Sequence, residues 1–479
     1  MLFNSIDFAL FLPIVFVIYW FLVNKNIRVQ NGFIVVASYF FYACWDWRFL
    51  FLILFSTLTD YIVGLYLNRD YSPKKRKIIL AISIVVNLSF LGFFKYCNFF
   101  IENFIDVFRL FGSELNIQTL KIILPVGISF YTFQTMSYTI DIYRKRIKAT
   151  SDFIAFAAFV GFFPQILSGP IERAANLLPQ FCAKRTFDYQ KAVDGLRQML
   201  WGLFKKVVIA DTAAIYVNQI FEQSTTLSGS TLAVGVVLFS FQIYADFSGY
   251  SDIAIGTARL FGINLRQNFS YPNFSRSVPE FWRRWHISLS SWFRDYLYIP
   301  LGGSKGNMWM KIRNVFIIFL VSGFWHGANW TFICWGGLNA IYMLPSMIRK
   351  TNRKYLDVVA QEKLLPSLQD VFNIFLTFIL ITFSRIFFRS SDMAQAFQFV
   401  KSIFSSSFFE TVTIAIPATL LIFIAFFTVV EWIGRSQQHG LERFGLKWKK
   451  GFRWLLYFVL VVLILAFSGN AQEFFYFQF

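Results

Sequence analysis

Histidine is the residue type best suited to acid–base chemistry here, and one of the three histidines lies inside an apolar run. His326 stands in Ser322-Gly-Phe-Trp-His-Gly-Ala-Asn-Trp330, where an imidazole is costly unless a partner or a cavity accepts it. If this run is helical, Ser322, His326 and Asn329 are spaced i, i+4 and i+7 and share one stripe. A neutral imidazole can take a proton from a hydroxyl nucleophile and return it to a leaving group. We therefore predict His326 as the chemical centre; a structural hydrogen bond to a neighbouring helix is the alternative.

A second histidine, His286, lies in a segment rich in tryptophan and arginine, Glu280-Phe-Trp-Arg-Arg-Trp-His-Ile-Ser-Leu-Ser-Ser-Trp292. Its imidazole could orient an acceptor or a donor carbonyl, while Arg283 and Arg284 could meet phosphate or carboxylate. An aromatic and cationic belt at a membrane interface would explain the same residues. His439 lies in a basic loop, and we expect it to be solvated.

Two aspartates interrupt another apolar segment. Asp246 and Asp252, with Gln242 and Gly249, fall at helical steps of 4, 3 and 3 and form a polar stripe. A carboxylate inside a bilayer costs roughly 2.5–3.5 kcal/mol on insertion scales, so each should face a partner or a water-filled path. We expect pairing with an arginine of residues 259–311, ahead of a direct catalytic role. The sequence has no metalloprotease, phosphate-loop or serine-hydrolase motif and no metal-ligand spacing, so we predict no metal site.

The elements that must position these residues are membrane helices. Of 479 residues, 56% are hydrophobic and 15% are charged, more apolar side chain than a soluble core of this length could hide. Segments near the length that crosses a bilayer recur along the chain, which predicts an all-α polytopic membrane protein with about 11–12 transmembrane helices in one domain, 1–479. Glycines and prolines in 153–170 predict a re-entrant segment, and 259–311 should form an interfacial layer.

The net charge of +19 follows the same topology. Basic residues cluster in alternate loops, as the positive-inside rule requires, so lipid is the expected partner and nucleic acid is not. This assignment places both termini outside and His326 in the outer half of its span. The N-terminal stretch shows no cleavable signal peptide.

Several motifs together resemble the membrane-bound O-acyltransferase family, and in particular its bacterial alginate O-acetyltransferase type. The resemblance is carried by the two histidine segments, 281–303 and 322–330, and extends to other stretches along nearly the whole chain. These stretches are Leu124-Pro-Val-Gly-Ile-Ser-Phe-Tyr131, Phe163-Pro-Gln-Ile-Leu-Ser-Gly-Pro-Ile-Glu-Arg173, Tyr244-Ala-Asp-Phe-Ser-Gly-Tyr-Ser-Asp252 and Phe474-Phe-Tyr-Phe-Gln-Phe479.

The resemblance implies that His326 is catalytic and that His286 is the second active-site residue. It implies a ring of helices with a thin centre, no bound cofactor, and acetyl-CoA or another acyl thioester as donor on the cytosolic side. The acceptor would be a hydroxyl of an exported cell-surface polysaccharide, reached directly or through an exported SGNH-hydrolase-like acetyltransferase partner. A bacterial inner (cell) membrane would hold the protein. On this view His326 is a general base, and His286 or Asn329 places the reactants.

Other functions fit part of the sequence. Within the same family, a D-alanyl transferase of teichoic acid would take its acyl group from a carrier protein. A proton-coupled transporter could use the intramembrane aspartates and histidine, although the paired broken helices of such proteins are not evident. A scaffold for a polysaccharide export complex is a third possibility.

Overall fold

The computed structural model describes the chain except residues 114, 116, 168, 471, 473 and 476–479, and the regular structure of the described residues is helical throughout. Within the described residues, seven helical stretches are long and apolar enough to cross a membrane, and three shorter ones are also apolar. The seven are Ile27–Leu67, Pro73–Leu110, Gly229–Leu260, Met308–His326, Trp330–Ile348, Leu368–Arg389 and Lys450–Phe467. The predicted all-α, multi-pass membrane fold is therefore confirmed.

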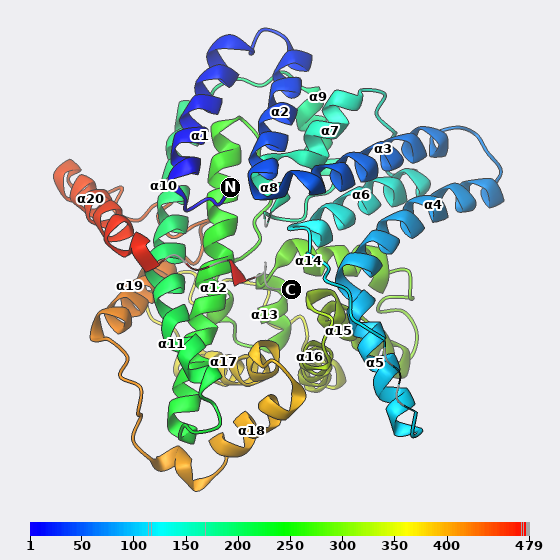
Figure 1. Cartoon of the computed structure of the whole chain (residues 1–479). Helices are drawn as coiled ribbons and strands as arrows, with labels where there is room; N and C mark the ends of the chain where they lie inside the picture. The colour runs from blue at the N-terminus through cyan, green and yellow to red at the C-terminus, as the bar shows by residue number, and fades with distance from the viewer. Residues whose placement is uncertain (114, 116, 168, 471, 473, 476–479) are drawn as a thin grey trace. The chain divides into compact units, whose positions relative to one another are not determined.

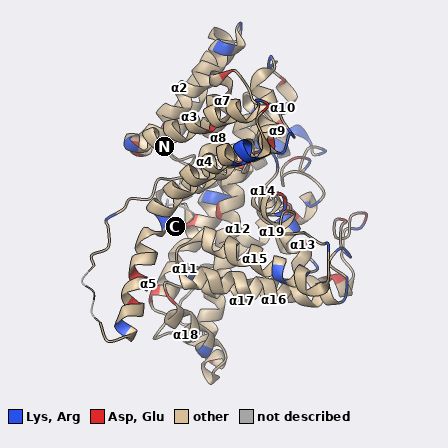
Figure 2. Ribbon diagram, turned by 90° about the vertical axis from the view of Figure 1, so that its right-hand side faces the viewer, with Lys and Arg blue, Asp and Glu red and all other residues tan. Residues whose placement is uncertain are grey.

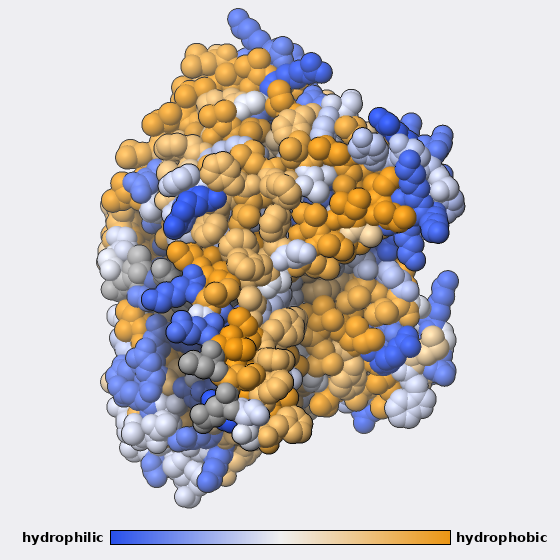
Figure 3. Space-filling model, turned by 45° about the vertical axis from the view of Figure 1, so that its right-hand side comes forward, coloured by the Kyte–Doolittle hydropathy of each residue, from blue (hydrophilic) through white to orange (hydrophobic). Residues whose placement is uncertain are grey.

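The surface agrees with a lipid environment. Large apolar side chains are exposed along the helices; Ile6 and Leu368, for example, are 80% and 89% exposed. Figure 3 shows apolar residues over much of the visible face, and Figure 2 shows long helical stretches without charged residues. Such surfaces would be unfavourable in water and are favourable in a bilayer.

The chain divides into two compact units. One contains Met1–Ala192 with Ala258–Leu265, and the other contains Val193–Thr257 with Arg266–Gln478. The helices of the first unit are α1 (Ile6–Val17), α2 (Ile27–Asp46), α3 (Leu50–Leu67), α4 (Pro73–Leu91), α5 (Cys97–Leu110), α6 (Ile128–Tyr143), α7 (Phe153–Gly161), α8 (Phe163–Ile166), α9 (Ala174–Cys182) and the start of α10 (Tyr189–Leu203) (Figure 1).

Within the first unit, α3, α4 and α6 pack around a buried polar centre. The Asp60 carboxylate accepts hydrogen bonds from Ser83 Oγ at 2.5 Å and from Asn87 Nδ2 at 2.9 Å. The predicted interruption of residues 153–170 is also present, because the chain leaves helical geometry at Phe162 between α7 and α8.

The second unit holds the segments that carry the candidate chemistry. After the end of α10 come a π-helix, η4 (Phe204–Ala210), then α11 (Asp211–Glu222) and most of α12 (Gly229–Leu260). The later elements are η5 (Pro272–Phe274), α13 (Val278–Arg284), α14 (Ile287–Phe293), η6 (Arg294–Tyr298), α15 (Met308–His326), α16 (Trp330–Ile348), α17 (Leu368–Arg389), α18 (Met393–Ile403), α19 (Ala418–Gly434) and α20 (Lys450–Phe467).

Helices α15 and α16 form a tight hairpin because glycines remove side chains from their interface. A Cβ added at Gly323 would lie 2.2 Å from the Phe332 carbonyl oxygen, and one at Gly336 would lie 2.3 Å from that of Phe319. Only a residue without a Cβ allows this approach, as in other membrane helix pairs. The hairpin fixes the end of α15, where His326 lies.

The intramembrane aspartates are paired with lysines, so the expected pairing with an arginine of residues 259–311 is wrong. Asp252 lies 2.5 Å from Lys205 Nζ, and Asp246 lies 2.8 Å from Lys206 Nζ. Both lysines come from η4, and just before it Gly202 of α10 meets Gly249 of α12, which brings the two backbones together. Lys206 also lies 2.7 Å from buried Asp211, so one lysine serves two carboxylates. These ion pairs stabilise the aspartates in their buried positions.

Candidate active site

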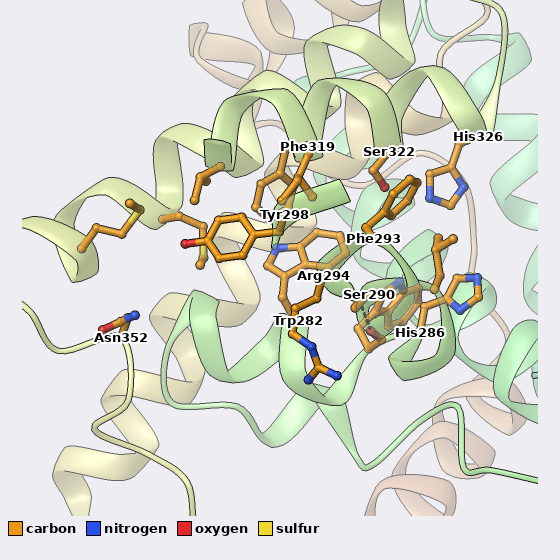
Figure 4. A pocket seen from close by; sticks show the side chains of 16 residues that line it. Trp282, His286, Ser290, Phe293, Arg294, Tyr298, Phe319, Ser322, His326 and Asn352 are labelled. Carbon is orange, nitrogen blue, oxygen red and sulfur yellow. Dashed lines mark hydrogen bonds between the residues drawn. The ribbon is translucent and has the colours of Figure 1, made fainter. Parts of the chain in front are cut away.

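A cavity of about 230 Å³ in the second unit brings His286 and His326 together. Its walls come from α13, α14, α15 and α16, with side chains from η6 and the loop that follows α16. Figure 4 shows the two imidazoles at the same end of the cavity and Asn352 at the opposite end. Two histidines from motifs far apart in sequence thus face one space.

One face of α15 forms a long wall of this cavity. Val315, Ile318, Phe319, Ser322 and His326 all line it, at spacings that keep them on one side of the helix. Eleven residues at 1.5 Å of rise correspond to roughly 16 Å of helix. The cavity is therefore elongated, and Ser322 and His326 share one face of α15, as their spacing in the sequence predicts.

The imidazole of His326 is buried among aromatic rings at the end of α15. The ring centres of Trp325, Trp335 and Phe388 lie 4.9, 5.2 and 5.2 Å from its own, at steep angles. These three rings come from α15, α16 and α17, so the hairpin and the next helix together hold the imidazole in place. Their size limits the space for a reacting group beside it.

Asn329 does not share the stripe of Ser322 and His326, so the predicted continuous helix is wrong here. Helix α15 ends at His326 because Gly327 is extended, with φ −163° and ψ 150°. Asn329 instead caps α16: its Oδ1 accepts from the Thr331 amide at 3.0 Å, and its Nδ2 donates to the Ser391 carbonyl at 2.7 Å. It is not among the residues that line the cavity.

His286 is held by a residue that the sequence did not reveal. Its Nδ1 lies 3.0 Å from the side-chain oxygen of buried Asn268. The same oxygen accepts from the backbone amide of Ser288 at 3.3 Å and from the Ser288 hydroxyl at 3.0 Å. A backbone amide can only donate, so the Asn268 atom is the carbonyl oxygen and Nδ1 carries the proton. The lone pair of the ring is therefore on Nε2.

His286 also has a strained backbone conformation and a buried side chain. His286 has φ +44° and ψ +54°, the left-handed conformation that non-glycine residues rarely adopt, at the N-terminus of α14. Such strain occurs where the surrounding structure requires it, often at functional sites. His286 lies outside the candidate membrane spans, and burial lowers its pKa to about 3, so its imidazole is neutral at physiological pH.

Arg283 and Arg284 are anchors for a loop and do not line the cavity. Arg283 donates to the carbonyl oxygens of Asn352 and Tyr355, at 2.8 and 2.5 Å. Arg284 bonds the Glu280 carboxylate at 3.0 Å and the Asp357 carbonyl oxygen at 2.7 Å. Both guanidinium groups are occupied by protein groups, which corrects the expectation that they meet phosphate or carboxylate of a ligand.

Arg294, which the sequence analysis did not single out, lies at the cavity instead. Its side chain is 62% exposed and its Nε lies 2.7 Å from Asp295. The sequence contained no spacing that would separate this arginine from its neighbours. Among the described residues, no group of three histidine, cysteine, aspartate or glutamate side chains is placed to hold a metal ion.

The remaining predicted residues lie in a neighbouring charged cluster. Asp252 lines a second, much smaller cavity together with Lys205, Glu431 and Asn268. His439 also lines it and is buried, with Nε2 3.2 Å from Asp194, so the expectation that it is solvated is wrong. Asp246 belongs to a different buried pair and lines neither cavity.

Residues 143–387, which include every residue of the elongated cavity, match the model of the membrane-bound O-acyltransferase family. The chain belongs to this family. It is 38% identical over 407 residues to a probable alginate O-acetylase of Pseudomonas aeruginosa, which covers 85% of this chain and 75% of that protein. A peptidoglycan O-acetyltransferase of Helicobacter pylori is 36% identical over 430 residues, with 84% and 79% covered.

A teichoic acid D-alanyltransferase of Bacillus subtilis is more distant, at 28% identity over 246 residues, covering 48% of this chain and 61% of that protein. This chain is thus a multi-pass membrane-bound O-acyltransferase. Its chemistry requires an acyl donor and an acceptor hydroxyl, and the elongated cavity with two histidines is the candidate place for both.

Proposed function

We propose that this O-acyltransferase moves an acetyl group from a cytosolic thioester, acetyl-CoA in the simplest case, to a hydroxyl of an exported cell-surface polysaccharide. Transfer is direct or passes through an exported SGNH-hydrolase-like partner, and the protein acts in the bacterial inner membrane. The observation that carries the proposal is the convergence of His286 and His326 at one end of an elongated aromatic cavity. The donor occupies the cavity with its thioester at the histidine end.

In this proposal His326 is the general base. It takes the proton from the acceptor hydroxyl as the oxygen attacks the thioester carbonyl, and the proton passes to the departing thiolate. His286 presents the Nε2 lone pair, because its Nδ1–H is bound to Asn268. In this tautomer Nε2 cannot donate to the carbonyl oxygen. The one proton of the reacting hydroxyl goes to His326, so Nε2 accepts a hydrogen bond from another group of the substrates and thereby positions the reactants.

Two observations favour an acetyl group: the activities for which the relatives are named, and the limited space beside His326. Two relatives named for O-acetyl transfer cover 84–85% of the chain at 36–38% identity, whereas the relative named for D-alanyl transfer covers 48% at 28%. The rings of Trp325, Trp335 and Phe388 crowd His326, which favours a small acyl group. An acetyl group also needs no charged partner, unlike the ammonium of D-alanine.

The decisive experiment measures transfer of radiolabelled acetyl from acetyl-CoA to polysaccharide in inner-membrane vesicles from cells that make the glycan. His326→Ala should lower the rate by at least about 100-fold, the usual contribution of a general base. His439→Asn is the matched control, because it alters a buried histidine outside the cavity and should keep the rate. Full activity of His326→Ala at equal protein levels would refute the proposal.

A donor comparison tests the acetyl assignment separately. The same vesicles receive either acetyl-CoA or a D-alanyl carrier protein, each with its own label. Incorporation from acetyl-CoA alone is expected. Incorporation from the D-alanyl carrier alone would overturn the acetyl assignment while leaving acyl transfer by His326 intact.

A further inference from the structure

Three residues, Gln472, Phe474 and Phe475, called the aromatic segment below, are fastened to α12 and η4 by two buried charged side chains. Lys206 Nζ donates to the Gln472 carbonyl oxygen at 3.1 Å, and the Asp246 carboxylate accepts from the Phe475 amide at 2.9 Å. Lys206 and Asp246 are 1% and 3% exposed and lie 2.8 Å apart. The two charges therefore bind each other and the backbone of the segment at the same time.

The segment places two phenylalanine rings behind the candidate active site. Phe474 and Phe475 are buried, and neither is among the residues that line the cavity. The Phe474 ring lies 4.3 Å from that of Tyr250 and 5.8 Å from that of Phe247. Phe247 in turn meets the imidazole of His286 edge to face, with ring centres 4.7 Å apart.

Phe475 is connected to the other histidine, His326, through one intervening aromatic ring. Its ring centre lies 5.3 Å from that of Phe239 and 6.1 Å from that of Phe388. Phe388 contacts the imidazole of His326 at 5.2 Å and an interplanar angle of 73°. Each phenylalanine of the segment is thus separated from one histidine by a single aromatic ring.

We infer that the aromatic segment is a positioning element of the catalytic pair, in which Phe474 supports His286 and Phe475 supports His326. The inference rests on the proposed function of the two histidines. Close-packed rings transmit small displacements, because a void behind Phe247 or Phe388 would let these rings and the imidazoles move. A displacement of about 1 Å at a reacting group can cost on the order of 100-fold in rate.

The contacts of Lys206 and Asp246 with the segment indicate that it has a positioning role and does not only fill apolar space. Burying charges is costly in a membrane protein, and phenylalanines need no charged partner to stay in an apolar site. Lys206 and Asp246 bind one carbonyl and one amide three residues apart, which fixes the register of the segment. Fixed register places each ring behind its own histidine.

Residue-specific modification of the three histidines tests this inference without measuring activity. The full chain, in lipid nanodiscs, is treated with diethyl pyrocarbonate, and carbethoxylation of each histidine is followed by mass spectrometry. Phe475→Ala should speed modification of His326 by at least about tenfold, since the cavity it leaves lets Phe388 move. Modification of His286 should change by less than about twofold, because local opening is confined to the altered contacts.

Phe474→Ala should give the opposite pattern, with faster modification of His286 and little change at His326. Phe409→Ala, which removes a ring that is 89% exposed, is the matched control and should change neither. Equal acceleration at both histidines in either variant, or no acceleration in both, would overturn the inference. Phe475→Leu, which keeps apolar volume, should restore most of the protection and so exclude general unfolding.

Kinetics then connect the segment to catalysis. Phe475→Ala should lower kcat by at least about tenfold with little change in KM for acetyl-CoA, because misplacing His326 affects the reaction more than donor binding. An equal rise in KM would show that the segment shapes the donor site instead. The labelling pattern stands even if His326→Ala proves active, so failure of this inference and failure of the proposed function can be told apart.

Discussion

Replacing Asn268 with leucine removes one oxygen atom on which the geometry of His286 depends. That oxygen accepts from His286 Nδ1, from the Ser288 amide and from the Ser288 hydroxyl. Leucine has a similar volume and no acceptor. The imidazole can then carry its proton on either nitrogen, and its ring is no longer held in one orientation.

The magnitude follows from the hydrogen bonds that are lost. A bond of about 1–1.5 kcal/mol selects the tautomer, which corresponds to roughly a tenfold change in the productive fraction. Loss of orientation adds to this, up to the order of 100-fold for a shift of about 1 Å. We therefore expect kcat to fall by about 10- to 100-fold. Since the imidazole can move its proton to Nε2, the Ser288 amide and hydroxyl are the two donors that lose this acceptor, which should also cost roughly 2–6 kcal/mol of stability.

The assay compares kcat for acetyl transfer with the thermal unfolding midpoint in one detergent. Asn87→Leu is the matched control, since Asn87 is equally buried, accepts two hydrogen bonds, and belongs to the first unit, whereas the cavity residues belong to the second. It should lower the midpoint and leave kcat per folded molecule nearly unchanged. A wild-type kcat for Asn268→Leu, or an equal loss in Asn87→Leu, would refute the assignment of Asn268 as the residue that orients His286.

Asn268→Asp extends this prediction to pH. A carboxylate beside Nδ1 favours the charged imidazole, so it raises the pKa of His286 above its present value of about 3. In the wild type His286 stays neutral down to that pH and contributes no acid limb between pH 5 and 8. In the variant, His286 gains a proton as pH falls through the raised pKa, Nε2 can no longer accept a hydrogen bond, and the rate falls. Identical pH–rate profiles for the two proteins would contradict this.

Two further predictions concern the elements around the site. Gly323→Ala puts a Cβ 2.2 Å from a backbone oxygen of α16, so it should separate the two helices of the hairpin and abolish most activity. Gly337→Ala, whose Cβ would have no atom nearer than 3.8 Å, should be tolerated. Equal expression and activity of both variants would contradict this. Lys206→Met leaves Asp211 and Asp246 buried without their shared cation and should cost about 3–5 kcal/mol of stability or more, seen as a lower unfolding midpoint than for exposed Lys447→Met.

The sequence was sufficient for the fold class and for the two histidine motifs. In lipid the backbone polar groups must be hydrogen-bonded within the chain, and apolar segments of this length achieve this as helices. The all-helical membrane fold therefore follows from composition and segment length. An imidazole inside an apolar run is costly, and that cost singled out His326 before its surroundings were known. The convergence of His286 and His326 on one cavity came from the resemblance to the family, because no local pattern relates residues 40 positions apart.

Local patterns failed where long-range packing decides the outcome. The stripe from Ser322 to Asn329 assumed an unbroken helix, but Gly327 is extended and the capping preference of Asn329 begins a new one. Lys205 and Lys206 are adjacent in the sequence, and nothing in their spacing indicates that they pair with aspartates of α12. Asn268 is 18 residues from His286 and became visible only when the hydrogen bonds were known.

The two histidines are held by different means, and this difference supports different roles for them. A general base works best when its affinity for protons is near the working pH, and a base whose pKa is about 3 retains a proton poorly. His286 is therefore suited to position a reactant by accepting a hydrogen bond without removing a proton. His326 ends α15 and lines the cavity, where its imidazole can meet the reacting hydroxyl. Glutamine keeps a hydrogen-bond acceptor but cannot serve as a general base. His286→Gln should therefore retain more activity than His326→Gln in the same acetyl-transfer assay.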